Sequence, residues 1–317
     1  MTITRLLKIG SALISLAILL NILSANSNAE IIETTLQVPV IVSLQHRAKL
    51  SHNITVTVVR ESSIKGQSPI ALLVHGRPSK SDERTLMGQV KYPGNAIWLA
   101  QHGFVVVVPT RIGYGVTGGP DIDYTGECDN KDYLNGLNGG IQEHEQVLRH
   151  VSKQPYVDAA HNIIIGESFG GLLALALAVD SASIPIDGVI NFAGGDGGDY
   201  SHLDRPCAPD QLEKTFAALG KNNQIKTLWL YSLNDRFWGI LYPKKWFSAF
   251  RDAGGNGEFI TLPADKNNGH FIFNRNGLAW HEQVEKFFKQ IGVPTKISVK
   301  NTPPEGGVTN SIKRPIN

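Results

Sequence analysis

The sequence has little net charge, no basic clusters and no internal repeat. Its 30 basic and 28 acidic residues nearly cancel, and Lys and Arg do not cluster among aromatic residues, so no nucleic-acid partner is indicated. No self-similarity recurs at the periods of solenoids or propellers. Hydrophobic residues make up 42% of the chain and charged residues 18%, which excludes global disorder. The remaining interpretation is an ordinary globular protein with one main domain.

The N-terminus has the order of a signal peptide. Arg5 and Lys8 precede an apolar run from Ile9 to Leu23, and a stretch of small and polar residues ends at Ala29. We predict a signal peptide over residues 1–29, cleaved before Glu30, and a periplasmic or secreted protein. An uncleaved membrane anchor is the alternative, but the run is shorter than the roughly 20 residues that span a bilayer. We therefore expect no stable membrane insertion after cleavage.

The rest of the chain alternates predicted strands and helices. Residues 34–62 alternate polar and apolar side chains, which predicts half-buried antiparallel strands at the leading edge of a sheet. Continuous apolar runs predict further, buried strands at 70–74, 104–108, 163–165, 188–192, 227–231 and 259–262. Helices are expected at 95–101, 139–152, 169–179, 209–219, 243–253 and 279–290.

This alternation predicts an α/β fold with a mostly parallel central sheet and helices on both faces. The domain is expected to span residues 30–292. Residues 293–317 are rich in Pro and Gly and predict a flexible C-terminal tail.

A nucleophile motif lies where the third apolar run meets a helical run. Gly166-Glu167-Ser168-Phe169-Gly170-Gly171 follows a predicted strand and precedes a predicted helix. In this context G-x-S-x-G forms a sharp turn that exposes the serine hydroxyl, and the flanking glycines leave room where strand and helix nearly touch. Ser168 is therefore the candidate nucleophile. The alternative is a glycine-rich turn with a capping serine.

A serine hydroxyl needs a base to accept its proton, and three histidines follow Ser168. His270 lies in the loop after the last predicted strand, and α/β folds with a G-x-S-x-G turn have their base in that loop. His281 falls inside the final helix and is more simply a surface residue. His202 lies too early in the chain, although it could line the site. His270 is the predicted base.

The base in turn needs an acid, and two aspartates are candidates. Asp235 ends the penultimate strand, the usual position in the chain order serine, acid, histidine. Asp196 follows the strand before it and is the alternative.

The oxyanion of a tetrahedral intermediate needs two backbone N–H donors. The first is predicted to be Phe169, directly after the nucleophile. The second should come from the loop His75-Gly76-Arg77-Pro78, and Arg77 is expected because proline has no N–H. His75 is interpreted as a structural histidine that braces this loop.

Three other patterns are not interpreted as ligand sites. Residues 113–118 fit G-x-G-x-x-G, but Gly-Pro-Asp follows instead of a helix, so a loop beside the site is favoured over a dinucleotide site. Glu143-His144-Glu145 is interpreted as a solvated helix face, and His281-Glu282 lacks a second histidine at metal-binding spacing. We predict neither a cofactor nor a metal.

From about Ser68 to Gly292 the chain resembles the dienelactone-hydrolase-like branch of the α/β-hydrolase superfamily. The resemblance rests on Val74-His75-Gly76, on residues 111–115 and 166–170, on Tyr231-Ser232-Leu233-Asn234-Asp235 and on Gly269-His270. It implies the α/β-hydrolase fold and a Ser168, Asp235, His270 triad. One departure matters, because dienelactone hydrolases use a cysteine nucleophile and this sequence has Ser168.

The predicted function is hydrolysis of small or medium carboxylic esters, with a small-molecule ester as substrate. A small-peptide hydrolase or an acyltransferase on the same triad is the alternative, and a non-catalytic binding module is a third possibility. The two cysteines, Cys128 and Cys207, are expected to pair, because an exported chain folds in an oxidising compartment. Both follow strands whose C-terminal ends meet at the edge where Ser168 emerges.

Overall fold

The computed structural model describes residues 30–43, 49–180 and 184–296. The predicted signal peptide and residues 297–317 of the predicted tail lie outside the described residues. The first residues of that tail pack on the domain. Val293 is buried, and the Lys296 N–H donates a hydrogen bond of 2.8 Å to the His102 carbonyl. The chain therefore still packs on the domain a few residues beyond the predicted boundary at 292.

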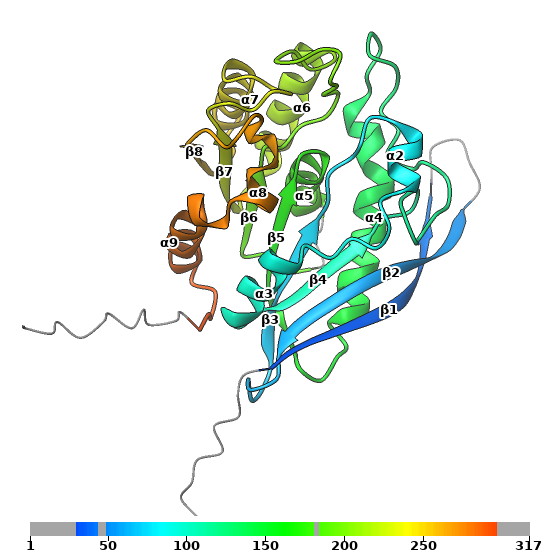
Figure 1. Cartoon of the computed structure of the whole chain (residues 1–317), viewed down its shortest axis with the longest axis vertical. Helices are drawn as coiled ribbons and strands as arrows, with labels where there is room; N and C mark the ends of the chain where they lie inside the picture. The colour runs from blue at the N-terminus through cyan, green and yellow to red at the C-terminus, as the bar shows by residue number, and fades with distance from the viewer. Residues whose placement is uncertain (1–29, 44–48, 181–183, 297–317) are drawn as a thin grey trace, which may run out of the picture.

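One eight-stranded sheet crosses the molecule in the order β1-β2-β4-β3-β5-β6-β7-β8 (Figure 1). The strands are β1 (Ile31–Val42), β2 (Leu50–Glu61), β3 (Ser68–Val74), β4 (Val105–Thr110), β5 (Val157–Glu167), β6 (Gly188–Phe192), β7 (Lys226–Ser232) and β8 (Gly257–Leu262). β1 and β2 are antiparallel to each other, β2 is antiparallel to β4, and β3 to β8 are mutually parallel. The predicted fold class and the antiparallel leading edge are confirmed.

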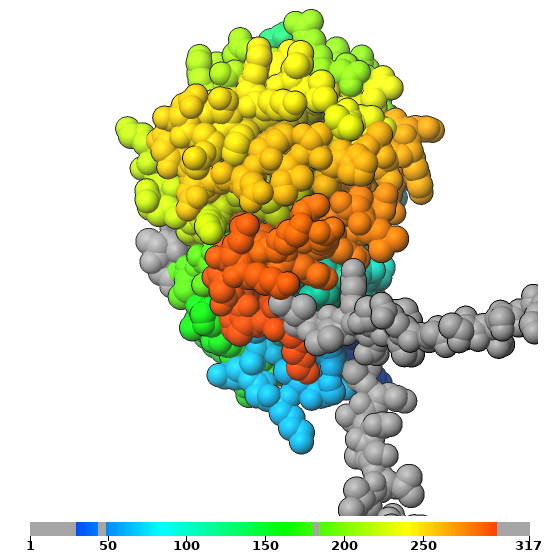
Figure 2. All heavy atoms as spheres, turned by 90° about the vertical axis from the view of Figure 1, so that its left-hand side faces the viewer, coloured from blue at the N-terminus to red at the C-terminus, as the bar shows by residue number. Residues whose placement is uncertain are grey.

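Helices cover both faces of the sheet. They are α2 (Ser81–Thr85), α3 (Pro93–Gln101), α4 (Tyr133–Val151), α5 (Phe169–Asp180), α6 (Pro209–Asn222), α7 (Leu241–Asp252), α8 (Ile272–Arg275) and α9 (His281–Ile291), with short 3-10 turns at Gly269–Phe271 and Gly277–Ala279. One core lies between the sheet and α4, α5, α6 and α7, and a second core lies between the other face and α3, α8 and α9. Figure 2 shows residues of α7, β8 and α9, yellow to orange-red, as one continuous face beyond β7. None of the described helices is long and apolar enough to cross a bilayer.

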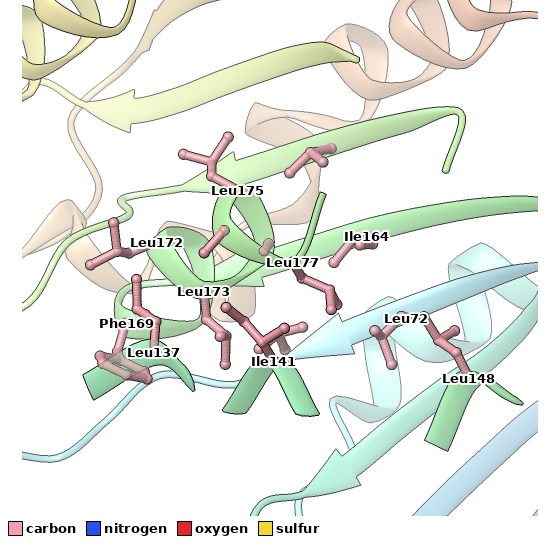
Figure 3. Packing of buried hydrophobic residues seen from close by; sticks show 14 of the residues in the cluster. Leu72, Leu137, Ile141, Leu148, Ile164, Phe169, Leu172, Leu173, Leu175 and Leu177 are labelled. Atoms are coloured by element: carbon pink, nitrogen blue, oxygen red, sulfur yellow. The ribbon is translucent and has the colours of Figure 1, made fainter. Parts of the chain in front are cut away.

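Helix α5 is fixed by packing on every side. Leu172, Leu173, Leu175 and Leu177 are all buried, and they share one core with side chains of α4 and of strands β3 and β5 (Figure 3). A helix that is apolar all round is stable only when it is enclosed in this way. Since α5 begins at Phe169, this packing also fixes the position of the preceding residue, Ser168.

Helix α4 begins six residues earlier than predicted. Asp132 caps it by accepting a hydrogen bond from the Asn135 N–H, and the helix then runs through three glycines that weaken the sequence signal. Close packing explains them. A Cβ atom on Gly140 would lie 2.7 Å from Leu173 of α5, and one on Gly136 would lie 2.4 Å from Thr125.

Candidate active site

Ser168 occupies a sharp turn between β5 and α5. Its φ of 58° lies in the left-handed region that non-glycine residues avoid. Its N–H donates to the Phe192 carbonyl at 2.9 Å. A Cβ atom on Gly166 would lie 2.0 Å from the Gly170 carbonyl oxygen, and one on Gly170 would lie 2.1 Å from the Val74 carbonyl oxygen. Both glycines of the motif are therefore required by the approach of strand and helix.

A cavity of about 610 Å³ opens above this turn, and we call it the Ser168 cavity. Its described walls include Ser168 and His270, Gly76 and Arg77 after β3, Cys128 and Lys131 before α4, Asp196 and Cys207 after β6, and Phe237 and Trp238 after β7. The loops that follow the parallel strands meet at one edge of the sheet, as this fold class leads one to expect.

Asp235 and His270 form a buried pair in this region. Asp235 is 1% exposed and His270 2% exposed. The two carboxylate oxygens of Asp235 lie 3.0 and 3.2 Å from Nδ1 of His270. A carboxylate only accepts, so Nδ1 carries the proton and Nε2 is the ring nitrogen left for another partner.

Neighbouring groups hold the pair in place. Oδ1 of Asp235 accepts hydrogen bonds from the N–H groups of Phe237 and Trp238, at 2.9 and 3.1 Å. The Asn268 side chain accepts from the N–H of His270 at 3.0 Å and also from that of Arg236. The rings of Phe237 and Trp238 meet the imidazole edge to face, with centroids 4.6 and 5.2 Å away. The imidazole therefore has little freedom to rotate.

The other sequence candidates lie elsewhere. Asp196 lines the Ser168 cavity, but its carboxylate accepts a hydrogen bond from the Thr125 hydroxyl at 2.6 Å and is not paired with His270. His202 is exposed and is not among the described residues that line the cavity. His281 begins α9 and stacks on Trp98 with ring centroids 4.2 Å apart, so it is half-buried and not the plain surface residue expected.

The loop after β3 reaches Ser168. A Cβ atom on Gly76 would lie 3.2 Å from Cβ and 3.8 Å from Oγ of Ser168. His75 is fully buried, its Nδ1 bonds the Gly76 carbonyl at 2.7 Å, and its Nε2 accepts from the Arg111 N–H at 3.1 Å. Burial, followed by the charge of Arg111, holds the pKa of His75 well below its ordinary value. His75 is thus the neutral structural histidine that the sequence indicates.

Arg111 is a buried residue whose role the sequence analysis missed. Its guanidinium donates to the His75 carbonyl and, through Nε, to Asp123 at 2.9 Å. It also lies over the Phe169 ring, 5.2 Å from the ring centroid. One side chain therefore links the loop that carries Arg77 to the start of α5. The only signal was the run at residues 111–115, which the sequence analysis used for the family resemblance without assigning a role to Arg111.

A family model described as the alpha/beta hydrolase family matches residues 71–282. The chain belongs to this family. Membership in this family shows that the protein is a hydrolase. No curated protein matches the hydrolase in sequence.

Solved structures agree with the family at the level of the fold. An acetyl xylan esterase from Paenibacillus sp. R4 shares 17% identity at a TM-score of 0.54, covering 83% of this chain and 90% of its own. A dienelactone hydrolase-like promiscuous phosphotriesterase from metagenomic libraries shares 16% identity at a TM-score of 0.52, and the match covers 83% of this chain and 99% of its own. An acylaminoacyl peptidase from Pyrococcus horikoshii shares 15% at 0.52, covering 81% of this chain and 41% of its own. The resemblance to the dienelactone-hydrolase-like branch is confirmed for the fold.

The guanidinium of Arg77 in this hydrolase is bound to the Asp121 carboxylate. Its two terminal nitrogens bond the Asp121 carboxylate at 2.7 and 2.6 Å, and Arg84 reaches the same carboxylate at 3.1 Å. Burial acts to raise the pKa of Asp121, but the hydrogen bonds and charges of the two arginines outweigh it and hold this pKa below its ordinary value.

Two buried acidic groups were not anticipated. Glu167 lines the cavity beside Ser168, where Oε2 accepts from the Tyr92 hydroxyl at 3.0 Å, and burial raises its pKa. The prediction of a solvated face for Glu143 and His144 is wrong, because both are fully buried. Glu143 accepts from the Ile112 N–H at 3.1 Å, so this helix face supports the loop from β4 and does not meet solvent.

The glycine-rich stretch 113–118 of the hydrolase is a tight turn after β4. The Gly113 N–H donates to the Gly118 carbonyl at 2.7 Å, and the next helix, α4, begins only at Tyr133. It therefore does not open a helix as a dinucleotide fingerprint must. Across residues 30–43, 49–180 and 184–296, no group of three or more His, Cys, Asp or Glu side chains is arranged to hold a metal ion.

Cys128 and Cys207 form a disulfide, with Cα atoms 4.9 Å apart. Both residues line the Ser168 cavity. The bridge ties the loop before α4 to the loop before α6, as the sequence indicates. The Tyr133 hydroxyl donates to the Cys207 carbonyl and fastens the same junction to α4.

Proposed function

We propose that this hydrolase cleaves small or medium carboxylic esters through an acyl-enzyme on Ser168. One observation carries the proposal: the hydrogen-bonded pair of Asp235 and His270 opens onto the same cavity as the strained turn of Ser168. A nucleophile, a base and an acid that orients the base are the parts that serine acyl transfer requires.

The proposed reaction has two halves. Asp235 keeps the Nδ1 proton on His270, so Nε2 takes the hydroxyl proton as Oγ of Ser168 bonds to the ester carbon. The tetrahedral intermediate then collapses, the bond from carbon to the alcohol oxygen breaks, and His270 returns the proton to the leaving alcohol. Water repeats the sequence on the acyl-enzyme and releases the acid and free Ser168. These steps use only protein groups and water.

The N–H groups of Phe169 and Arg77 are proposed as the oxyanion donors. Phe169 is the first residue of α5, so its N–H has no carbonyl one turn earlier in the helix to pair with. The Gly76 carbonyl is held by His75 on one side of a trans peptide, so the Arg77 N–H of that peptide points to the opposite side. Among the described residues this N–H has no acceptor. Both groups are therefore available to a developing negative charge.

Small acyl groups fit this site best. The loop between β6 and α6 is short and polar, with Asp196, Asp199, His202, Asp204 and Arg205, and it cannot form the broad apolar lid of a lipase. We expect acetate and butyrate esters to exceed long-chain triglyceride emulsions in kcat/KM. A clear preference for the emulsions would contradict this.

We also propose that the protein acts outside the cytoplasm. The N-terminal sequence and the disulfide support export to an oxidising compartment.

The decisive experiment is labelling by a fluorophosphonate probe together with turnover of p-nitrophenyl butyrate. We expect both in the wild type and neither in Ser168→Ala, while Ser248→Ala on the exposed face of α7 retains both. Comparing the ester with aminoacyl anilides tests the peptidase alternative, and transfer to added alcohols tests the acyltransferase. Absence of labelling in folded wild-type protein would favour a non-catalytic binding module.

A further inference from the structure

The Ser168 cavity carries an excess of negative charge. Of the described residues that line it, six are Asp or Glu and three are Lys or Arg. Arg77 and Arg84 are both bound to Asp121, so neither guanidinium is available to a ligand. Lys131 donates to the Thr125 hydroxyl at 3.0 Å. The carboxylates that remain therefore dominate the field inside the cavity.

Asp196 is the central carboxylate of this set. It is 9% exposed, and Oδ2 accepts from the Thr125 hydroxyl. Oδ1 accepts no hydrogen bond from any residue that the structure describes, and none of the ion pairs between described residues includes Asp196. A buried carboxylate is unfavourable unless a cation or donors face it. Lys131 reaches this carboxylate only through the Thr125 hydroxyl, so among the described residues no cation contacts Asp196 directly, and Oδ1 remains open to a ligand.

A second buried carboxylate, that of Glu167, also lines the cavity. Glu167 precedes Ser168 and is 6% exposed, and its Oε1 is buried with no partner among the described residues. Asp196 is tied to the same turn, because the N–H of the adjacent Gly195 donates to the Ser168 carbonyl at 3.1 Å. Two carboxylates with unused acceptor oxygens therefore adjoin Ser168.

Aromatic side chains complete the surroundings. Tyr124 and Tyr200, on the two loops that the disulfide joins, line the cavity although they are 55% and 64% exposed. Trp238 lies deeper in the same wall. Aromatic faces attract an ammonium group, and the attraction adds to that of a nearby carboxylate.

We propose that the cavity binds esters that carry an ammonium group, with Asp196 as the counter-ion of that group. The inference rests on the proposed function in that the ligand is taken to be an ester seated at Ser168. An anionic ester would meet the same carboxylates without a free basic partner and would be repelled. The cation can belong to the alcohol or to the acyl part, and the experiment distinguishes the two.

Equilibrium binding to the Ser168→Ala protein tests the proposal without requiring turnover. Calorimetry compares two isosteric pairs that differ by one charge. In the first pair, butyrylcholine carries the charge in its alcohol part and 3,3-dimethylbutyl butyrate is its neutral isostere. In the second pair, phenyl 4-(trimethylammonio)butyrate carries the charge in its acyl part and phenyl 5,5-dimethylhexanoate is its neutral isostere. We expect the cationic member of one pair to bind at least about tenfold more tightly, and that pair identifies the side.

Second substitutions in the Ser168→Ala protein identify the counter-ion. Asp196→Asn keeps an acceptor for Thr125 and should reduce the cationic preference to within about threefold. Asp252→Asn removes an exposed charge outside the cavity and should retain it. Equal binding within both pairs overturns the proposal, as does an equal loss for both members in Asp196→Asn. Failure of the proposed function would appear instead as absence of fluorophosphonate labelling in the wild type.

Discussion

Nδ1 of His270 lies 3.0 Å from Oδ2 of Asp235, and the other carboxylate oxygen of Asp235 accepts two backbone N–H groups from the turn that follows β7. The backbone thus orients the carboxylate independently of the histidine. Because the backbone holds the carboxylate in place and a carboxylate only accepts, the imidazole nitrogen that faces it carries the proton. This arrangement favours Asp235 over Asp196 as the acid of the proposed mechanism.

Asp235→Asn should lower kcat for p-nitrophenyl butyrate by about three to four orders of magnitude with little change in KM. An amide at this position donates toward Nδ1 and favours the wrong tautomer, while its size preserves the turn. Steady-state kinetics and urea unfolding at pH 7 measure activity and folding separately. Collapse of turnover in Asp196→Asn, with survival in Asp235→Asn, would reverse the assignment.

Arg111→Lys should lower kcat by about 10- to 100-fold and change KM by less than about threefold. Lysine keeps the charge, but it cannot bond the His75 carbonyl and Asp123 together while lying over the Phe169 ring. The proposed donor N–H of Arg77 then loses its support, and oxyanion stabilisation acts on the transition state more than on bound substrate.

Arg60→Lys is the matched control, because Arg60 also lies over an aromatic ring, that of Tyr156, but on β2. Arg60→Lys should leave kcat and KM near their wild-type values. A rise in KM at unchanged kcat in Arg111→Lys would instead indicate a role in binding substrate.

The stability of the hydrolase should fall in acid partly through His144. Burial, followed by the charge of Arg111, lowers the pKa of His144 to about 3 in the folded chain, whereas the unfolded chain has an ordinary histidine pKa near 6.5. The contribution is fully present above about pH 6.5 and is lost as pH falls toward 3, because only the unfolded state gains the proton. The loss is about 1.4 kcal/mol per pH unit.

Urea unfolding of wild type and His144→Gln at pH 7.5, 5.5 and 4.5 checks this slope. The difference in unfolding free energy between the two proteins should shrink toward acid, since glutamine has no proton to gain. His150→Gln, half-buried on the same helix, controls for the substitution itself. A difference that stays constant with pH would contradict the prediction.

Local patterns made the frame of the fold predictable. Buried strands and the turn around Ser168 are specified by neighbouring residues, through apolar runs and through glycines that a strand and a helix force together. Chain order then selected Asp235 and His270. The structure brings these two side chains together in a hydrogen-bonded pair, and their catalytic roles stay predictions.

Long-range polar partners were not predictable in this way. Arg111, Glu143 and His144 look like surface residues in the sequence, and their burial depends on loops and a helix that meet only in the folded chain. The start of α4 was missed for a related reason, because its glycines lower helix propensity and are explained only by contacts with Thr125 and Leu173. Tertiary packing decided both cases.

The disulfide should stabilise the hydrolase and shape its cavity without being needed for the chemistry. Cys128 and Cys207 are 79 residues apart, and a crosslink over such a loop contributes roughly 4 kcal/mol by the chain-entropy model. Replacing both by alanine should therefore lower the melting temperature by about 10 °C. Both residues line the cavity, whereas Asp235 and His270 are held by Phe237 and Asn268 outside the bridged loops, so KM should rise severalfold and kcat should stay within about threefold.

Reduction of the wild type should reproduce these changes, which isolates the bond from the loss of the two side chains. Dithiothreitol should raise KM and lower the melting temperature of the wild type, and it should have no effect on the double alanine variant, which has no cysteine left to reduce. The order of events is informative: KM should change at temperatures where circular dichroism still reports the folded sheet, since the bridge joins two loops and no strand. Titration of two free thiols in unfolded, unreduced protein from the periplasm would rule the bridge out. Loss of kcat before any change in KM would show that the bridge supports the proposed triad itself.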